Sequence, residues 1–264
     1  MINKLLTWYK ENGRHELPWR KTRNPYKVLV SELMLQQTQV PRVIPKYKAF
    51  LKQFPTLKKL AQAERADVLR AWQGLGYNSR AARFHALAKA ITKLPETREE
   101  LLQLPGIGPY TAGAIMIFAH NKPAASVDVN VERVIKRLCW KQTQQPSKQE
   151  VEQKALELIQ ASNNPHDWHS MLMDFGSTIC KRTPSCLKCP VRSQCKSKGK
   201  RADETTKKQP KFKGSTRYYR GQLLKKLLEK PLEEKDITKE EKEALRALIK
   251  EKLVTKQASV YHIH

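Results

Sequence analysis

The sequence predicts an all-α fold, and two observations support this. The 264 residues include only 10 glycines, and few segments alternate apolar and polar residues as strands do. Apolar residues instead recur at helical spacing, as in residues 28–35, 40–44, 68–72 and 151–159. We therefore expect a core of about ten helices that ends at a cluster of cysteines.

Short segments rich in proline, glycine or asparagine separate these periodic stretches, and each is expected to end one helix and begin another. They are NPY at 24–26, FPT at 54–56, GLGYN at 74–78, LPGIGPY at 104–110 and NNPHDW at 163–168.

The composition changes after residue 195. Residues 196–213 contain eight basic and two acidic residues, which is typical of a mobile linker. Beyond this linker we expect a small domain at 214–264, with helices at 216–229 and 238–252 and then an alternating segment, LVTKQASVYHI, that fits a hairpin. This order matches part of a winged helix, and a plain helical hairpin fits it equally well.

Four of the five cysteines lie within sixteen residues, in a C-x5-C-x2-C-x5-C run made of Cys180, Cys186, Cys189 and Cys195. Four thiolates suit a [4Fe-4S] cluster or a tetrahedral zinc, and the spacing alone decides little between them. The two five-residue intervals fit a polynuclear centre better than paired zinc knuckles. The first residues, MINKLLTWYKENG, have no apolar signal-peptide core, so we expect a cytoplasmic protein without disulfides. Cys139 is expected to be a small buried hydrophobe.

The chain is strongly basic, with 51 Lys and Arg residues against 25 Asp and Glu residues and a formal net charge of +26. Such an excess is stabilised where phosphates neutralise it and release counterions, so a nucleic acid is the expected partner. No apolar stretch is long enough to span a bilayer, and no membrane partner is expected.

The segment LPGIGPYTAGAI at 104–115 predicts a phosphate-binding hairpin between two helices. Gly106 and Gly108 allow a tight turn with positive φ and no Cβ, so amides at the start of the next helix are free to face a phosphate. A hairpin of this type grips the DNA backbone without reading its sequence.

The chain resembles the helix-hairpin-helix DNA glycosylases that carry a [4Fe-4S] cluster and, within them, the adenine DNA glycosylases of the MutY type. Six segments carry the resemblance: LPWR at 17–20, NPYKVLVSELMLQQTQV at 24–40, WQGLGYNSRA at 72–81, LPGIGPYTAGAI at 104–115, SVDVNVERV at 126–134 and LMDFGSTIC at 172–180. The resemblance implies a two-lobed fold over residues 1–195. One lobe is a six-helix barrel at 22–125, and the other combines 1–21 with 126–195 and the cluster.

The resemblance also implies a monofunctional enzyme of base excision repair, which removes adenine mispaired with guanine or 8-oxoguanine from double-stranded DNA as a monomer. Glu32 lies in an apolar helical stretch, where desolvation favours a protonated acid that can protonate the adenine. Asp128, expected at a helix start, would stabilise the cationic sugar. Asn130 and Tyr110 match the positions that orient these groups, and a tyrosine, unlike a lysine, cannot form an imine with the sugar.

Further residues match the DNA contacts of this family. Tyr77, with Leu75 beside it, resembles the aromatic residue that intercalates when the base is flipped out. Gln37 and Thr38 resemble the residues that contact the opposing guanine or 8-oxoguanine. Gly106 and Gly108 belong to the phosphate-binding hairpin.

The sequence departs from the family pattern in three places. The first cysteine interval has five residues where six are usual, and Val129 stands where glycine is common. The 69 residues from 196 to 264 are too few for a Nudix-like domain, which leaves the preference for 8-oxoguanine open. Two alternatives remain: a thymine or uracil mismatch glycosylase, and a non-catalytic protein that binds damaged DNA.

Overall fold

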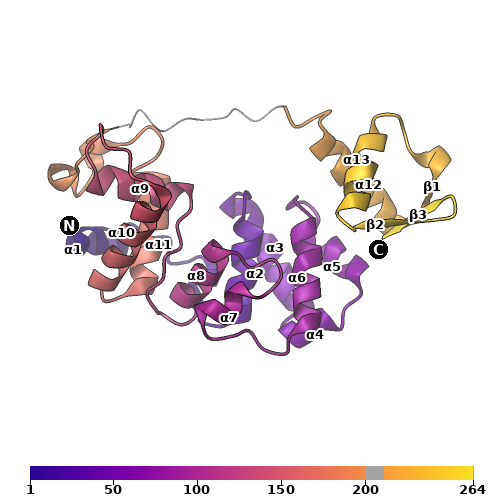
Figure 1. Ribbon diagram of the computed structural model, residues 1–264, viewed down its shortest axis with the longest axis horizontal. Helices are drawn as coiled ribbons and strands as arrows, with labels where there is room; N and C mark the ends of the chain where they lie inside the picture. The colour runs from indigo at the N-terminus through magenta and orange to yellow at the C-terminus, as the bar shows by residue number, and fades with distance from the viewer. Residues whose placement is uncertain (200–210, 264) are drawn as a thin grey trace. The chain divides into compact units, whose positions relative to one another are not determined.

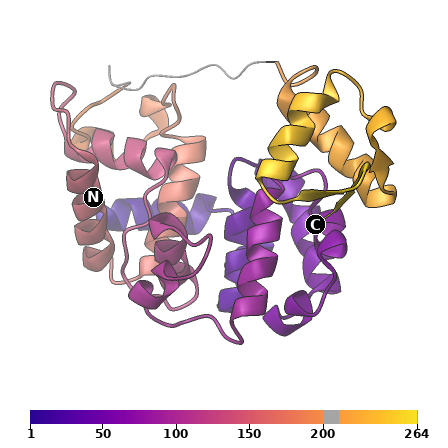
Figure 2. The same cartoon turned by 45° about the vertical axis from the view of Figure 1, so that its right-hand side comes forward.

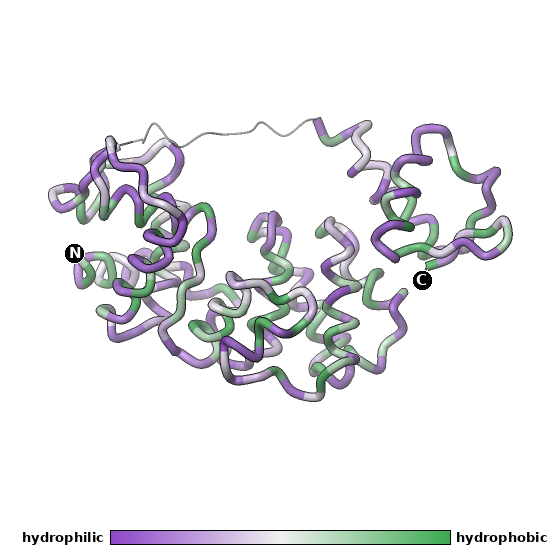
Figure 3. The backbone as a smooth tube through the Cα atoms, viewed as in Figure 1, coloured by the Kyte–Doolittle hydropathy of each residue, from purple (hydrophilic) through white to green (hydrophobic). Residues whose placement is uncertain are grey.

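The computed structural model describes residues 1–199 and 211–263, and this part of the chain is mainly helical, which confirms the all-α prediction (Figure 1). Hydrophobic and hydrophilic residues are interspersed along most of the chain (Figure 3), whereas the helix Pro109–Phe118 is predominantly apolar. Residues 200–210, which make up most of the expected basic linker, lie outside the described residues. Within the two described ranges, no helix combines the length and apolar character needed to cross a bilayer.

The chain forms two units, each built from two separate stretches. The first unit combines residues 1–32 with the described residues from 94 to 199. Its helices are α1 (Ile2–Asn12), η1 (Pro18–Lys21), α2 (Pro25–Leu35) as far as residue 32, α7 (Arg98–Leu102), α8 (Pro109–Phe118), α9 (Val129–Cys139), α10 (Lys148–Ala161), α11 (Pro165–Thr178), η2 (Cys186–Lys188) and η3 (Arg192–Gln194).

Helix α11 lies at the centre of the first unit. It packs against α1, α8, α9 and α10, and it buries Trp168, Met171, Leu172 and Phe175. Trp8 of α1 meets Phe175 edge-on, with ring centroids 5.3 Å apart. The predicted breaks at NNP and LPGIG fall where expected, because α10 and α7 end just before them and α11 and α8 begin at the prolines.

The second unit combines residues 33–93 with 211–263. Its elements are α3 (Val40–Gln53), α4 (Leu57–Ala61), α5 (Arg65–Trp72), α6 (Ser79–Ala90), α12 (Thr216–Glu229), β1 (Leu232–Glu233), η4 (Glu234–Asp236), α13 (Glu241–Lys250), β2 (Val254–Gln257) and β3 (Val260–Ile263). Phe50 is fully buried and its ring lies 5.8 Å from that of Trp72 and 6.2 Å from that of Phe84. These aromatic contacts join α3, α5 and α6.

Residues 211–263 form what we call the C-terminal module, drawn in orange and yellow in Figure 2. Helix α12 matches the predicted 216–229, whereas α13 is shorter than the predicted 238–252. The expected hairpin is present as β2 and β3, and β1 joins it to give an antiparallel sheet of order β1-β3-β2. The module is therefore more than a plain helical hairpin, because a three-stranded sheet accompanies its two α-helices.

Candidate active site

Three sequence-predicted catalytic residues lie together in the first unit. Glu32 lies on α2 and is buried, with 6% of its surface exposed. Tyr110, in the first turn of α8, forms a side-chain hydrogen bond with Glu32, and Asp128 interacts electrostatically with both. The chain thus brings a buried acid, a phenol and a second carboxylate to one place.

Burial dominates the chemistry of Glu32. Loss of solvation raises the pKa of its carboxyl to about 7, because burial disfavours the charged form. The hydrogen bond from Tyr110 opposes this shift, the charge of Asp128 adds to it, and the charge of Arg20 opposes it. Burial also raises the pKa of the Tyr110 phenol well above its usual value, so this group remains a hydrogen-bond donor. At neutral pH a substantial fraction of Glu32 carries a proton that it can donate.

The predicted hairpin places Tyr110. Gly106 has φ +84° and uses the left-handed conformation that favours glycine. The expectation of positive φ at Gly108 is wrong: this residue has φ −95° and ψ 177°, because it is the N-cap of α8 and an N-cap takes extended backbone. At Gly113, a Cβ would come within 2.3 Å of the Ala125 carbonyl oxygen. This close approach seats Ser126 against α8, where its hydroxyl donates to the Tyr110 carbonyl (3.1 Å).

Asp128 is the N-cap of α9, as expected. Its Oδ1 accepts hydrogen bonds from the backbone amides of Asn130 (2.9 Å) and Val131 (2.8 Å), and its Oδ2 accepts one from Asn130 Nδ2 (3.1 Å). These bonds hold the carboxylate at the positive end of the helix dipole. Capping fixes the carboxylate in one orientation, so its structural role is compatible with a catalytic one. Val129 is 74% exposed and leaves this arrangement undisturbed.

A hydrogen-bonded chain leads from Asp128 to the cysteine loop. Arg133 donates through Nη2 to Asn130 Oδ1 (2.9 Å) and to the Gly176 carbonyl (2.8 Å), and through Nε to the Cys180 carbonyl (3.0 Å). Arg133 lies within SVDVNVERV, but sequence reasoning did not single it out, because nothing in a helical arginine says which carbonyls it will reach.

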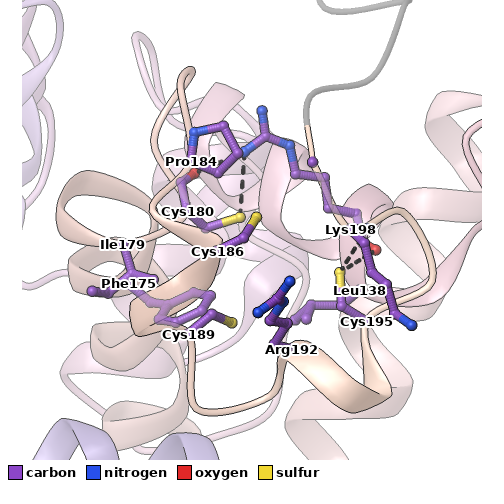
Figure 4. A pocket seen from close by; sticks show the side chains of 12 residues that line it. Leu138, Phe175, Ile179, Cys180, Pro184, Cys186, Cys189, Arg192, Cys195 and Lys198 are labelled. Atoms are coloured by element: carbon purple, nitrogen blue, oxygen red, sulfur yellow. Dashed lines mark hydrogen bonds between the residues drawn. The ribbon is translucent and has the colours of Figure 1, made fainter.

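The four predicted ligand cysteines line one cavity in the first unit (Figure 4). Buried Arg137 braces this loop: its guanidinium lies 3.5 Å from Cys180 Sγ and donates to the carbonyls of Lys181 (2.6 Å) and Arg182 (3.0 Å). Arg192 also lines the cavity. Sequence reasoning missed Arg137, since it lies far from the cysteines along the chain.

The donor set fits a metal centre held by four thiolates. The four side chains are thiols that line one cavity, and none of the five cysteines forms a disulfide. Four thiolates suit a [4Fe-4S] cluster or a tetrahedral zinc.

A buried ion-pair network lies beside the acid. Asp174 of α11 has a fully buried side chain and pairs with Arg20 Nη1 (2.6 Å) and Arg14 Nη2 (2.6 Å). These pairs hold the pKa of Asp174 below its usual value despite burial, which acts in the opposite direction. Arg20 is the arginine of the LPWR motif and also acts electrostatically on Glu32. Asp174 was not predicted, because a lone carboxylate in a helix gives no sign of a distant partner.

The residues expected to probe the base pair lie in the second unit, on two loops. Gln37 has φ +55° and Tyr77 has φ +47°, and Tyr77 is 43% exposed. Thr38 Oγ1 donates to the Leu75 carbonyl (3.3 Å), which links the two loops. Leu75 itself is 4% exposed, so Tyr77 is the large hydrophobic side chain that this turn presents to solvent.

Arg80 organises both loops. Its guanidinium donates to the carbonyls of Leu33, Gln36 (2.8 Å) and Gly76 (2.9 Å), and it lies 5.6 Å from the centre of the Tyr77 ring. The side chain is buried, since Arg80 is 5% exposed. The residue stands in WQGLGYNSRA, but its role as a brace was not predicted.

Arg80→Lys should loosen these loops. A lysine has one compact ammonium group and cannot reach carbonyls on both loops at once, which leaves buried acceptors unpaired. We expect a loss of about 2–3 kcal/mol in unfolding free energy, together with weaker binding of double-stranded DNA. Denaturant titration and fluorescence anisotropy measure both. Arg42→Lys, at an exposed arginine on α3, is the control. Equal effects of the two substitutions would contradict the bracing role.

The hairpin before α8, together with a buried acid beside a fixed carboxylate, defines the class of helix-hairpin-helix DNA glycosylases. A family profile described as HhH-GPD superfamily base excision DNA repair protein matches residues 30–161. The adenine DNA glycosylase of Mycolicibacterium smegmatis is 38% identical over 229 residues, covering 83% of this chain and 78% of that protein. The chain belongs to the HhH-GPD superfamily and, within it, to the adenine DNA glycosylases, so the resemblance read from the sequence is confirmed.

Other adenine DNA glycosylases are considerably longer than the matched region. The Buchnera aphidicola (subsp. Baizongia pistaciae) protein is 38% identical over 199 residues, which cover 73% of this chain and 57% of the relative. The match to the human protein, at 39% identity, covers 74% of this chain and 38% of the relative.

Solved structures share the fold. A thermostable thymine-DNA glycosylase has a TM-score of 0.68 and 29% identity, covering 75% of this chain and 94% of that one. A trapped endonuclease III–DNA covalent intermediate has a TM-score of 0.63 and 25% identity, covering 75% of this chain and 93% of that one. These structures confirm the predicted helix-hairpin-helix glycosylase fold.

Proposed function

We propose that the chain is a monofunctional DNA glycosylase that excises adenine mispaired with guanine or 8-oxoguanine. The single observation that carries this proposal is the buried Glu32, whose pKa is raised to about 7 and which lies with Tyr110 and Asp128. The adenine DNA glycosylases among its relatives support adenine as the base.

The geometry supports a stepwise hydrolysis. Glu32 donates its proton to N7 of the extrahelical adenine, and the electrons of the C1′–N9 bond leave with the base. Asp128, held by the amides at the start of α9, faces the cationic sugar and stabilises it. Water then adds to C1′ and its proton returns to the Glu32 carboxylate. Tyr110 orients Glu32, and Asn130 orients Asp128.

Three features support the remaining roles. The phenol of Tyr110 stands at the hairpin position where a lysine would attack the sugar, so the product is an abasic site and the strand stays intact. The hairpin with Gly106 and Gly108 holds a backbone phosphate. The exposed ring of Tyr77 fills the gap that the flipped base leaves, Leu75 supports it as a buried residue of the same turn, and Gln37 and Thr38 contact the opposing base.

Cys180, Cys186, Cys189 and Cys195 would hold a [4Fe-4S] cluster, which ties the loop into a fixed shape and can exchange electrons. Anaerobic purification should give brown protein with iron and sulfide each at about four per chain. Cys186→Ser should lower both contents. Cys139→Ser is the control, because Cys139 lies outside the cavity and should leave the iron unchanged. Zinc in place of iron would contradict the cluster.

The partner that follows is double-stranded DNA with a mismatched or oxidised base pair, bound by one copy of the chain in the cytoplasm. The test uses four duplexes with A opposite 8-oxoguanine, A opposite G, T opposite G and U opposite G, each treated with alkali after incubation. Cleavage confined to adenine strands is expected. The structural likeness to a thymine-DNA glycosylase makes a thymine or uracil mismatch glycosylase the second candidate, and pyrimidine release would select it. Tight binding without cleavage would select a non-catalytic damage-binding protein.

A further inference from the structure

The C-terminal module is fixed to α5 by two arginines. Arg70 Nη2 donates to the Leu228 carbonyl (2.9 Å) at the end of α12, and Arg65 Nη2 donates to the Lys252 carbonyl (2.7 Å) just after α13. The last carbonyls of a helix lack partners within it and carry the negative end of the dipole, so cations bind well there. Arginines of α5 thus bind the chain at the C-terminal ends of both helices of the module, and all three helices belong to the second unit.

This docking creates an open groove of about 580 Å³ along α6. One wall is a single face of α6, with residues spaced three and four apart. The other wall is the start of α5 and the turn after α13. The lining residues are Ser79, Ala82, Arg83, Ala86, Arg65, Glu251 and Lys252.

The charge in this groove is positive. Arg65, Arg83 and Lys252 line it, and none of them forms an ion pair with a described residue. Glu251 is the one acidic residue in the lining, and it is already paired with Arg220 (2.6 Å). Arg83 and Lys252 are exposed, so their charges are available to a ligand. The positive end of the α6 dipole reinforces this charge.

The groove begins next to the loop that carries Tyr77. Ser79 opens α6 two residues after Tyr77, whose exposed ring has been assigned above to the gap left by the flipped base. A duplex strand that meets Tyr77 therefore has backbone phosphates within a short distance of this face of α6. The small side chains of Ala82 and Ala86 leave room for a strand to approach.

We propose that this groove is a second DNA-binding site, in which Arg83, Lys252 and Arg65 bind phosphodiester groups of the strand beside Tyr77. The C-terminal module then contributes directly to DNA binding. The site binds backbone phosphate and contacts no base, so it increases the affinity for any duplex regardless of sequence. The proposal rests on the DNA-binding role assigned to Tyr77 under the proposed function.

The test compares the full chain with the double variant Arg83→Ala/Lys252→Ala, by anisotropy on an undamaged duplex over a range of salt concentrations. Loss of two phosphate contacts should weaken binding about tenfold at 0.1 M salt and reduce the slope of log K against log salt by about 2. Lys239→Ala removes an exposed charge from the same module outside the groove and is the matched control. An equal effect in control and double variant, or an unchanged slope, overturns the proposal.

A second arm separates nucleic acid from free phosphate. If inorganic phosphate at matched ionic strength protects the wild-type chain, but not the double variant, from unfolding, while all proteins bind DNA equally, the groove is a small-anion site and the proposal is wrong. The binding readout needs no base excision. Failure of the wild-type chain to release adenine would therefore count against the proposed function without touching this result.

Discussion

Glu32→Gln should abolish most turnover and at the same time stabilise the protein at alkaline pH. Removal of a general acid typically costs a factor of about a thousand in rate. Duplex affinity should persist, because glutamine keeps the shape of the side chain and its hydrogen bond with Tyr110. Single-turnover kinetics on a duplex with A opposite 8-oxoguanine measures the rate, and anisotropy measures the affinity. A variant that keeps its rate would show that another group donates the proton.

The gain in stability follows from the raised pKa. Since the pKa of Glu32 is about 7 in the folded chain and 4.5 ordinarily, the folded state binds this proton more tightly than the unfolded chain does. The free energy of unfolding therefore falls as the pH rises from about 4.5 through 7, and above pH 7 the penalty is about 3 kcal/mol. The glutamine variant lacks this penalty. Its free energy of unfolding should therefore be higher than that of the wild type at pH 8 and equal to it near pH 4. Glu99→Gln, at an exposed position of the same unit, should leave the pH dependence of denaturant unfolding unchanged.

Asp174→Asn should destabilise the first unit strongly. The substitution leaves Arg20, whose side chain is 7% exposed, without its counter-ion in a buried site. Breaking a buried pair in this way costs about 3–5 kcal/mol. Calorimetry or denaturant unfolding measures the loss. The control is Glu152→Gln, which removes one member of a surface pair with Lys148 and should cost less than about 1 kcal/mol.

Two further results separate the ion pair from simple packing. Arg20→Met combined with Asp174→Asn removes both charges, so it should recover part of the lost stability. In the single variant the charge of Arg20 is no longer balanced, and this charge lowers the pKa of Glu32. The alkaline limb of the pH–rate profile should therefore move to lower pH. If the alkaline limb does not move and the double variant recovers no stability, Asp174 contributes only through packing.

Local signals in the sequence were enough to predict the helices, their breaks and the chemistry of Glu32. The apolar residues around Glu32 predicted that it is buried, and the residues before Asp128 predicted that a helix begins there. The braces formed by Arg80, Arg133 and Arg137 were not predictable, since each joins carbonyls that are far apart in the sequence or lie on irregular loops. Positive φ was assigned to both hairpin glycines because either one permits a turn, and only the folded backbone shows that Gly108 acts as an N-cap. The strand β1 was missed because two residues carry no alternation.

The interleaved order of the two units has a practical consequence for work on this chain. The polypeptide passes from the first unit to the second, back to the first, and then contributes the C-terminal module to the second. Neither unit can be produced as one uninterrupted fragment. A truncation at residue 199 would strip α5 of the carbonyls that Arg65 and Arg70 bind. The guanidinium of Arg65 would lose its carbonyl partner, and Arg70 would keep only its ion pair with Asp67 (2.6 Å). Deletion of the C-terminal module therefore alters the surface of the remaining part of the second unit. Point substitutions test the role of the module without this side effect.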